Sequence, residues 1–115
     1  MLLNSPADYT TTNDPVEVPG SRTKLLGFRA IKVVAKNTHA SNVVKWAVIG
    51  VVKNGDEEVI LQAGTTTLAG VTQAVYNIAA ADEGFEEIYV TGESNADGNA
   101  GTLRLRIIGA RSNIP

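Results

Sequence analysis

The chain has 115 residues, a net charge of −2, one histidine and no cysteine. A chain of this length forms one domain as a rule, and it can bury enough surface to fold without a metal ion or a disulfide. Because cysteine is absent, disulfides, thiolate zinc sites and cysteine nucleophiles are excluded. The lysines and arginines are scattered among carboxylates and form no visible basic stripe, so we expect no nucleic-acid partner.

Membrane and secretion segments are not visible in the sequence. No apolar stretch approaches the ~20 residues that span a bilayer. The beginning of the sequence also lacks the basic segment and long apolar run of a secretion signal. We therefore expect a soluble protein with no membrane partner.

Residues 1–22 differ from the rest of the chain, because prolines interrupt a polar series there. Proline removes a ladder donor and biases the preceding residue to extended geometry, which leaves at most a short edge strand at Val16–Val18. We predict an extended N-terminal arm over 1–22, pinned against its own body or a neighbour, and a β-sandwich domain over 23–115. We also expect removal of residues 1–20 to spare the fold.

Strand signals follow one another from Thr23 onward. Leu25–Lys36 is long and β-rich, but its apolar alternation changes phase near Ala30, which predicts a β-bulge. The clearest pair of strands covers residues 43–52 and 57–62, around an Asn54-Gly55 turn of type I′.

The first strand of this hairpin is apolar on both faces, because alternate residues of a strand point to opposite sides. One face carries Val44, Trp46, Val48 and Val52, and the other carries Val43, Ala47, Ile49 and Val51. A simple two-layer domain buries one face of a strand, so the second face is predicted to be covered by something else, such as another subunit.

The remaining strands are predicted at 71–78, 85–91 and 102–108, with one helical turn at 79–83. In the last strand Leu103, Leu105 and Ile107 alternate with Arg104 and Arg106, so one side faces the core and the other faces water. The outward arginines form either a solvated face or a row that binds carboxylates, for which Glu57, Glu58, Glu86 and Glu87 are possible partners. The pattern as a whole predicts an all-β fold, an antiparallel β-sandwich of jelly-roll or immunoglobulin-like type.

Candidate catalytic groups are weak, and we expect no enzyme. His39 lies in a polar loop without a nucleophile signature, and the pairs Glu57-Glu58 and Glu86-Glu87 point to opposite faces of their strands. Residues 93–99 space oxygen side chains as a calcium loop does, but Arg104 stands where a closing Glu is needed. We therefore expect no metal site and no cofactor.

The order of several motifs resembles a β-sandwich module that is common in virion proteins of tailed bacteriophages. The resemblance covers about residues 37–110 and rests on Asn37-Thr38, Trp46 with Val48, the lysine-containing turn of Gly50-Val-Val-Lys53-Asn-Gly, the segment Ile88-Tyr-Val-Thr-Gly92 and the closing Leu103-Arg-Leu-Arg. It implies a structural component of the virion. A free-standing module with an arm is most similar to a capsid decoration, or cement, protein.

This resemblance implies a homo-oligomer, often a trimer, that is made in the host cytoplasm and clamps the major capsid protein on the surface of the virion. The predicted interface residues are Leu2, Leu3, Tyr9, Val43, Ile49, Val51, Arg104 and Arg106. The alternative is a receptor-binding or carbohydrate-binding module associated with a tail or fibre. In that case Tyr9, Tyr76 and Tyr89 would stack on sugars.

Overall fold

The computed structural model describes residues 1–52, 57–61, 66–79 and 85–111. The predicted Asn54-Gly55 turn lies outside these ranges, and so does nearly all of the helical turn predicted at 79–83. The strands of the described residues, in chain order, are β1 (Asp8–Thr10), β2 (Val16–Glu17), β3 (Thr23–Lys24), β4 (Phe28–Asn37), β5 (Val44–Val52), β6 (Glu57–Ile60), β7 (Thr66–Leu68), β8 (Gln73–Asn77), β9 (Glu87–Ser94) and β10 (Thr102–Arg111).

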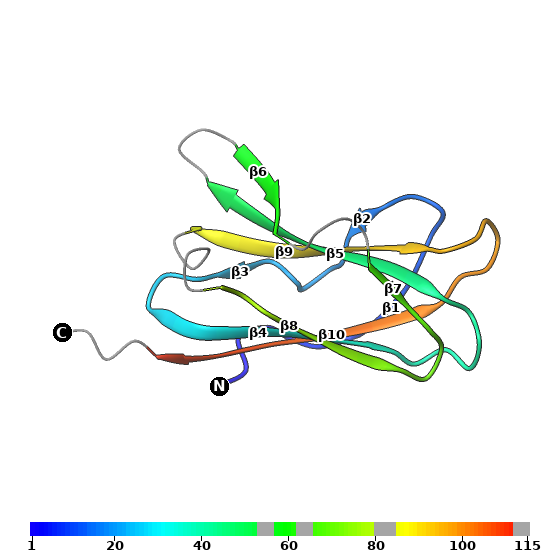
Figure 1. The fold of residues 1–115 in the computed structure, drawn as a ribbon, viewed down its shortest axis with the longest axis horizontal. Coiled ribbons are helices and arrows are strands. Elements are labelled where there is room, and N and C mark those ends of the chain that lie inside the picture. Colours follow the sequence, from blue (N-terminus) through cyan, green and yellow to red (C-terminus); the bar gives the residue numbers. More distant parts are fainter. Residues whose placement is uncertain (53–56, 62–65, 80–84, 112–115) are drawn as a thin grey trace.

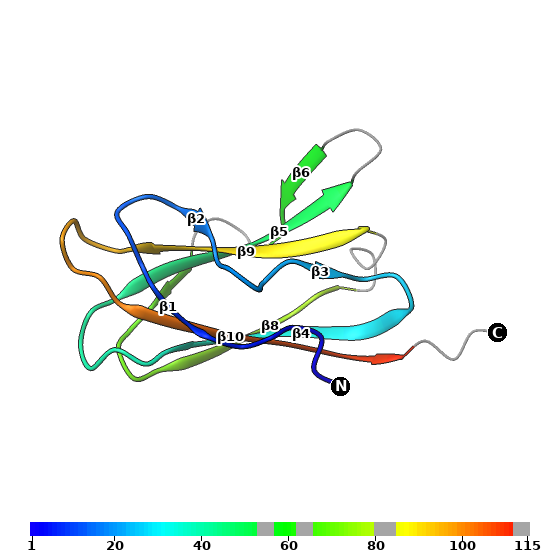
Figure 2. The same cartoon turned by 180° about the vertical axis from the view of Figure 1, so that it is seen from behind.

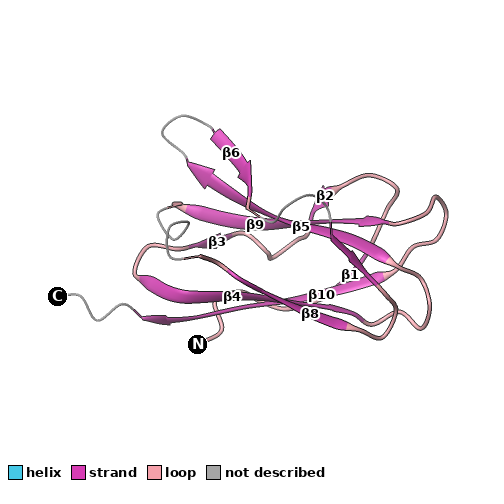
Figure 3. Ribbon diagram, in the orientation of Figure 1, coloured by secondary structure: helices cyan, strands magenta, loops and turns pink. Residues whose placement is uncertain are grey.

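The strands form two antiparallel sheets that pack face to face (Figures 1 and 3). Sheet A has the order β1-β10-β4-β8, and sheet B has the order β2-β9-β5-β6, with β3 paired to β9 and β7 paired to β5. The all-β antiparallel sandwich predicted from the sequence is therefore confirmed. Within the described residues, no helix has the length and apolar character needed to cross a membrane.

The predicted strand at Leu25–Lys36 begins three residues late, at Phe28. Residues 25–27 form a turn that carries the chain from sheet B to sheet A, with the Phe28 amide donating to the Leu25 carbonyl at 3.0 Å. Gly27 makes this turn possible because its φ of +87° is unfavourable for residues with a Cβ. Strand propensity continues across the turn, which is why the sequence pattern missed it.

The predicted β-bulge lies where the alternation changes phase. Ile108 of β10 pairs with Lys32, whereas Ala110 pairs with Arg29, so two residues of β4 oppose one residue of β10. Ala30 is the extra residue of β4, and its φ is +52°. The bulge shifts the alternation of inward and outward side chains along β4. As a result, Ile31, Val33 and Ala35 all face the core.

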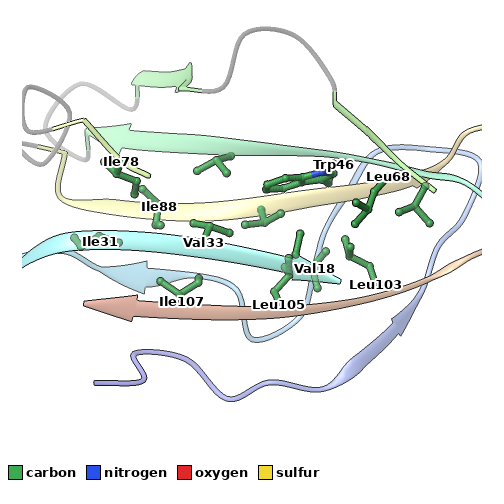
Figure 4. Close-up of a cluster of buried hydrophobic side chains, with 14 of the residues drawn as sticks. Val18, Ile31, Val33, Trp46, Leu68, Ile78, Ile88, Leu103, Leu105 and Ile107 are labelled. Atoms are coloured by element: carbon green, nitrogen blue, oxygen red, sulfur yellow. The ribbon is translucent and has the colours of Figure 1, made fainter. Parts of the chain in front are cut away.

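The core lies between the two sheets and is centred on aliphatic side chains around one indole ring (Figure 4). Trp46 is only 1% exposed, so it is a core residue. Its Nε1 is the one fully buried side-chain polar atom among the described residues that has no hydrogen-bond partner. An unpaired buried donor costs stability, so this indole is held by packing and not by its polar group.

The N-terminal arm is built into the sandwich. β1 pairs with β10 at the edge of sheet A, and β2 pairs with β9 at the edge of sheet B, so the arm crosses from one layer to the other (Figure 2). Val18 belongs to the core at 2% exposed. The arm is therefore pinned against its own body, although it has an extended path.

Candidate interaction surfaces

The single histidine has a structural role in its loop. The Nδ1 atom of His39 accepts hydrogen bonds from the backbone amides of Ser41 at 3.0 Å and Asn42 at 2.9 Å. These bonds require that Nδ1 carries no proton. Across the ranges that the structure describes, no three side chains of the His, Asp and Glu type gather into a possible metal site.

The 93–99 segment contains the end of β9 and most of the connection to β10, which is made by backbone turns. The amide of Asn99 donates to the carbonyl of Ala96 at 3.1 Å, and the amide of Gly98 donates to the Asn13 side chain at 3.1 Å. Arg104, the residue in the closing position of the calcium-loop spacing, instead bonds the Asp8 carboxylate at 3.3 Å. The segment therefore leads from one strand to the next and contacts the arm.

The outer face of sheet B is covered largely by side chains of the same chain. Ile49 lies opposite Tyr89 on one neighbouring strand and opposite Ile60 on the other. Only 8% of Ile49 and 6% of Val51 are exposed. The second apolar face of β5 was predicted to need an outside cover, but residues from distant parts of the chain supply most of that cover.

A chain of polar contacts runs over this face of sheet B. Arg22, which follows β2, lies over the ring of Tyr89 at 4.5 Å and bonds Glu17 at 2.7 Å and the buried Glu87 at 3.1 Å. The Tyr89 hydroxyl donates to Glu58 at 2.8 Å. Hydrogen bonds to Glu17 and then Glu87 raise the pKa of Arg22 further above its usual range, so its charge is permanent. This network joins the arm to the β5–β6 hairpin.

Tyr89 should give the stability of the protein an alkaline pH dependence. Burial, followed by the hydrogen bond to Glu58, raises the pKa of Tyr89 from 10.0 to about 12. The folded state favours the neutral phenol, so this stabilisation is complete below about pH 10 and is lost as the pH rises to about 12. We expect the Tm of the wild-type protein to fall more steeply over this range than that of Tyr89→Phe. Tyr9→Phe, which keeps the Tyr89 hydroxyl, is the control, and equal slopes for all three proteins would contradict this prediction.

The outer face of sheet A is cationic. Residues that oppose each other in antiparallel strands share a face, which places Arg104 beside Lys36 and Ala110 beside Arg29. Five of the ten lysines and arginines share this face, which we call the cationic face: Arg29, Lys32, Lys36, Arg104 and Arg106. These cations are scattered in the sequence and come together only because β4 and β10 are neighbouring strands.

Strand β6 forms an exposed edge of sheet B. The β5–β6 hairpin rises away from both layers (Figure 1). All four residues of β6 are exposed, including Val59 at 45% and Ile60 at 56%. An edge strand with exposed aliphatic side chains is a template for pairing with another chain.

An open pocket of about 190 Å³ lies between the loops at one end of the sandwich. It is lined by small and polar residues: Ser41, Asn42, Val43, Asn95, Ala96 and Asn99. The side-chain amides of Asn95 and Asn99 have no hydrogen-bond partner among the described residues. Such groups suit a neutral polar ligand.

The tyrosines predicted to stack on sugars are not free. Tyr9 and Tyr76 pack against the core, and the Tyr76 hydroxyl donates to the Leu61 carbonyl at 2.9 Å. Tyr89 lies under Arg22. Within the described residues, no tyrosine presents an open ring as a sugar platform.

The eight predicted interface residues do not form one surface. Leu2 pairs with Ile108 and lies at the same outer face as Arg104 and Arg106, and it is 46% exposed. Leu3 and Tyr9 pack against the core. The other three are dispersed: Val43 lines the open pocket, and Ile49 and Val51 lie on the outer face of sheet B.

The sequence pattern missed Lys32 and Lys36 as candidates. Both stand in β4, and the register places Lys36 opposite Arg104. The only signal available was the alternation of lysine with apolar residues in β4. That alternation indicates an outward face but does not say which strand lies next to it.

Together these features define a small β-sandwich that has surfaces for contact. Comparison with solved structures finds a similar fold in "Crystal structure of PirA", with a TM-score of 0.58 over 90% of this chain and 93% of that chain, at 12% sequence identity. The structure titled "Crystal structure of SPBc2 prophage-derived protein YomS" matches with a TM-score of 0.39 and 15% identity, over 94% of this chain and 97% of that chain. No protein-family model matches the sequence, and neither does any curated protein. At this identity the likeness to PirA shows the fold alone.

Proposed function

We propose that this chain is a structural virion protein, a capsid decoration protein that stabilises a phage head by bridging subunits of the major capsid protein. The motif order over residues 37–110 supports a virion module, and the sandwich fold is the one which that resemblance implies. The protein is made in the host cytoplasm and is then located on the capsid surface.

The observation that carries this proposal is the protruding β5–β6 hairpin with its exposed aliphatic edge. Val59 and Ile60 are exposed on a strand whose outer edge pairs with nothing in the described residues. Burial of such side chains against a second copy is favourable by roughly 25 cal/mol per Å² of apolar surface. A trimer, the oligomer that the resemblance implies, presents the same capsid-binding surface several times, so modest contacts add up to strong attachment.

The role of this edge can be tested by Ile60→Lys. A charge on the edge strand should block pairing with another copy but leave the core between the two sheets untouched, because Ile60 is 56% exposed and lies opposite Ile49 on the outer face of sheet B. We expect the wild-type protein to show about three times the 12.1 kDa mass of the chain by light scattering, and Ile60→Lys to show the mass of one chain. Ile49 is unsuitable for this test because a charge at a buried position would also disturb folding.

The matched control is Leu26→Lys, which places the same charge on a side chain that is 91% exposed and lies in the turn between β3 and β4. It should keep the wild-type mass. Sedimentation with undecorated capsids of the encoding virus then tests the function itself. A wild-type protein that is a single chain in solution and stays in the supernatant would overturn the proposal.

The second candidate is a receptor-binding or carbohydrate-binding module of a tail or fibre. The open pocket with its free amides favours it, because saccharide hydroxyls pair with such groups. Asn95→Ala combined with Asn99→Ala should abolish binding on a glycan array if this candidate is correct. The same pair of changes should not alter sedimentation with capsids if the decoration function is correct.

A further inference from the structure

We propose that the cationic face of sheet A is a docking surface for an acidic protein surface. The proposal deepens the proposed function, since the acidic surface would belong to the capsid. It depends on three groups of observations: the number of cations, their lack of carboxylate partners among the described residues and the apolar side chains between them.

The cations of this face are concentrated on two adjacent strands. Alternate residues along a strand are ~7 Å apart and neighbouring strands are ~4.8 Å apart. The backbone positions of Lys36 and Arg104 are therefore ~5 Å apart, and that of Arg106 is ~8 Å from both Lys32 and Lys36. Lys36 and Arg104 are directly opposite each other. Like charges in this position are destabilising. The fold therefore keeps an arrangement that an acidic partner would relieve.

Most of these charges are not neutralised by the part of the chain that the structure describes. Arg104 bonds the partly exposed Asp8 at 3.3 Å. Lys32, Lys36, Arg29 and Arg106 have no carboxylate partner among the described residues. Asp8 is also the single carboxylate among the described strand residues of this face. This contrasts with the outer face of sheet B, where Arg22 is held by two glutamates.

Aliphatic side chains fill the spaces between the cations. Val34 lies opposite Arg106 and also opposite Val75, which is 52% exposed, and Ile108 lies opposite Lys32. Leu2 extends this set at the edge of the sheet and is 46% exposed. Arginine mixed with apolar side chains is typical of protein interfaces. Planar guanidinium groups also bind carboxylates through two parallel hydrogen bonds.

A protein partner suits this face better than a nucleic acid does. The described strand residues of the face include no aromatic side chain on which bases could stack. A face that combines cations with aliphatic side chains is complementary to an acidic protein surface that also carries apolar groups.

The test measures the affinity for labelled poly-L-glutamate by fluorescence anisotropy, with duplex DNA as the competing polyanion. The variant Lys36→Gln/Arg106→Gln removes two charges from the cationic face. Its matched control, Lys24→Gln/Lys45→Gln, removes two charges from the outer face of sheet B and gives the same net charge of −4. Both variants are compared with the wild-type protein at low salt and at about 0.15 M salt, where the Debye length is about 8 Å.

We expect the first variant to bind poly-L-glutamate about tenfold more weakly than the wild-type protein at low salt, and the control to bind as the wild-type protein does. The proposed docking face would be overturned if both variants bound poly-L-glutamate equally weakly, or if the wild-type protein did not bind it. Tighter binding of DNA that is lost in the first variant would also overturn it, in favour of a nucleic-acid surface. If poly-L-glutamate binding depends on the cationic face but the protein does not sediment with capsids, the docking face stands and the proposed function fails.

Discussion

Deletion of residues 1–20 is expected to abolish cooperative folding. The arm supplies Val18 to the core and an edge strand to each sheet, and the Val18 amide donates to the Val90 carbonyl at 2.8 Å. The side chain of Asn4 behaves like a peptide group, because it donates to the Leu105 carbonyl at 3.0 Å and accepts from the Ile107 amide at 2.8 Å. Without these groups the edges of both sheets are left open. We therefore no longer expect the fold to survive this deletion.

Far-ultraviolet circular dichroism during urea unfolding will measure this effect. The full chain should unfold in one sharp transition, whereas the deleted chain should show a broad transition or aggregate. A sharp transition at an unchanged urea midpoint would contradict the structural role of the arm.

A matched pair of point substitutions measures what the buried hydrogen bonds of the arm contribute to stability, apart from its other contacts. The buried hydroxyl of Thr11 bonds Ser94 at 2.9 Å and accepts from the Gly101 amide at 2.9 Å. Thr11→Val should lower the free energy of unfolding by about 1–3 kcal/mol, because it leaves buried polar groups without partners. The control, Thr12→Val, alters the exposed neighbouring residue and should change the free energy of unfolding by less than about 0.5 kcal/mol.

Replacement of Trp46 by alanine is expected to give the largest loss of stability from a single change. The indole is 1% exposed at the centre of the core, so Trp46→Ala should lower the free energy of unfolding by about 3–5 kcal/mol. Trp46→Phe should cost less, because it keeps an aromatic ring and removes the unpartnered Nε1 donor.

Circular dichroism is again the measurement, since the variants lack the single tryptophan that fluorescence would follow. Val75→Ala, at an exposed position of sheet A, is the control and should stay within about 0.5 kcal/mol of the wild-type protein. A loss for Trp46→Phe as large as that for Trp46→Ala would show that the size of the ring, and not its buried donor, decides the outcome.

Local patterns predicted most of the fold because they are set by neighbours in sequence. The alternation of Leu103, Leu105 and Ile107 with arginines predicts the inner and outer faces of β10, and the change of phase near Ala30 predicts the bulge. The turn at Leu25–Gly27 was missed because β-branched and aliphatic residues continue on both sides of it. Its glycine marks the turn only when the change of sheet is known.

The surfaces were harder to predict because they are assembled from distant segments. The cover over Ile49 comes from Tyr89 and Ile60 on the two neighbouring strands, with Arg22 over the Tyr89 ring. The cationic face joins β4 to β10, which are separated by most of the chain. Sequence spacing gives the side of a strand on which a residue lies, but it does not give the adjacent strand, so these surfaces require the topology of the sheets.

The position of the arm also sets the order of events during synthesis. Asp8 bonds Arg104 across a sequence separation of 96 residues, so β1 emerges from the ribosome long before its partner β10 exists. At about 5–20 residues per second the arm waits for roughly 5–20 s with its apolar residues uncovered. Contacts over such long separations slow folding. Completion of the sandwich is therefore a late step, taken when the last strand has been made.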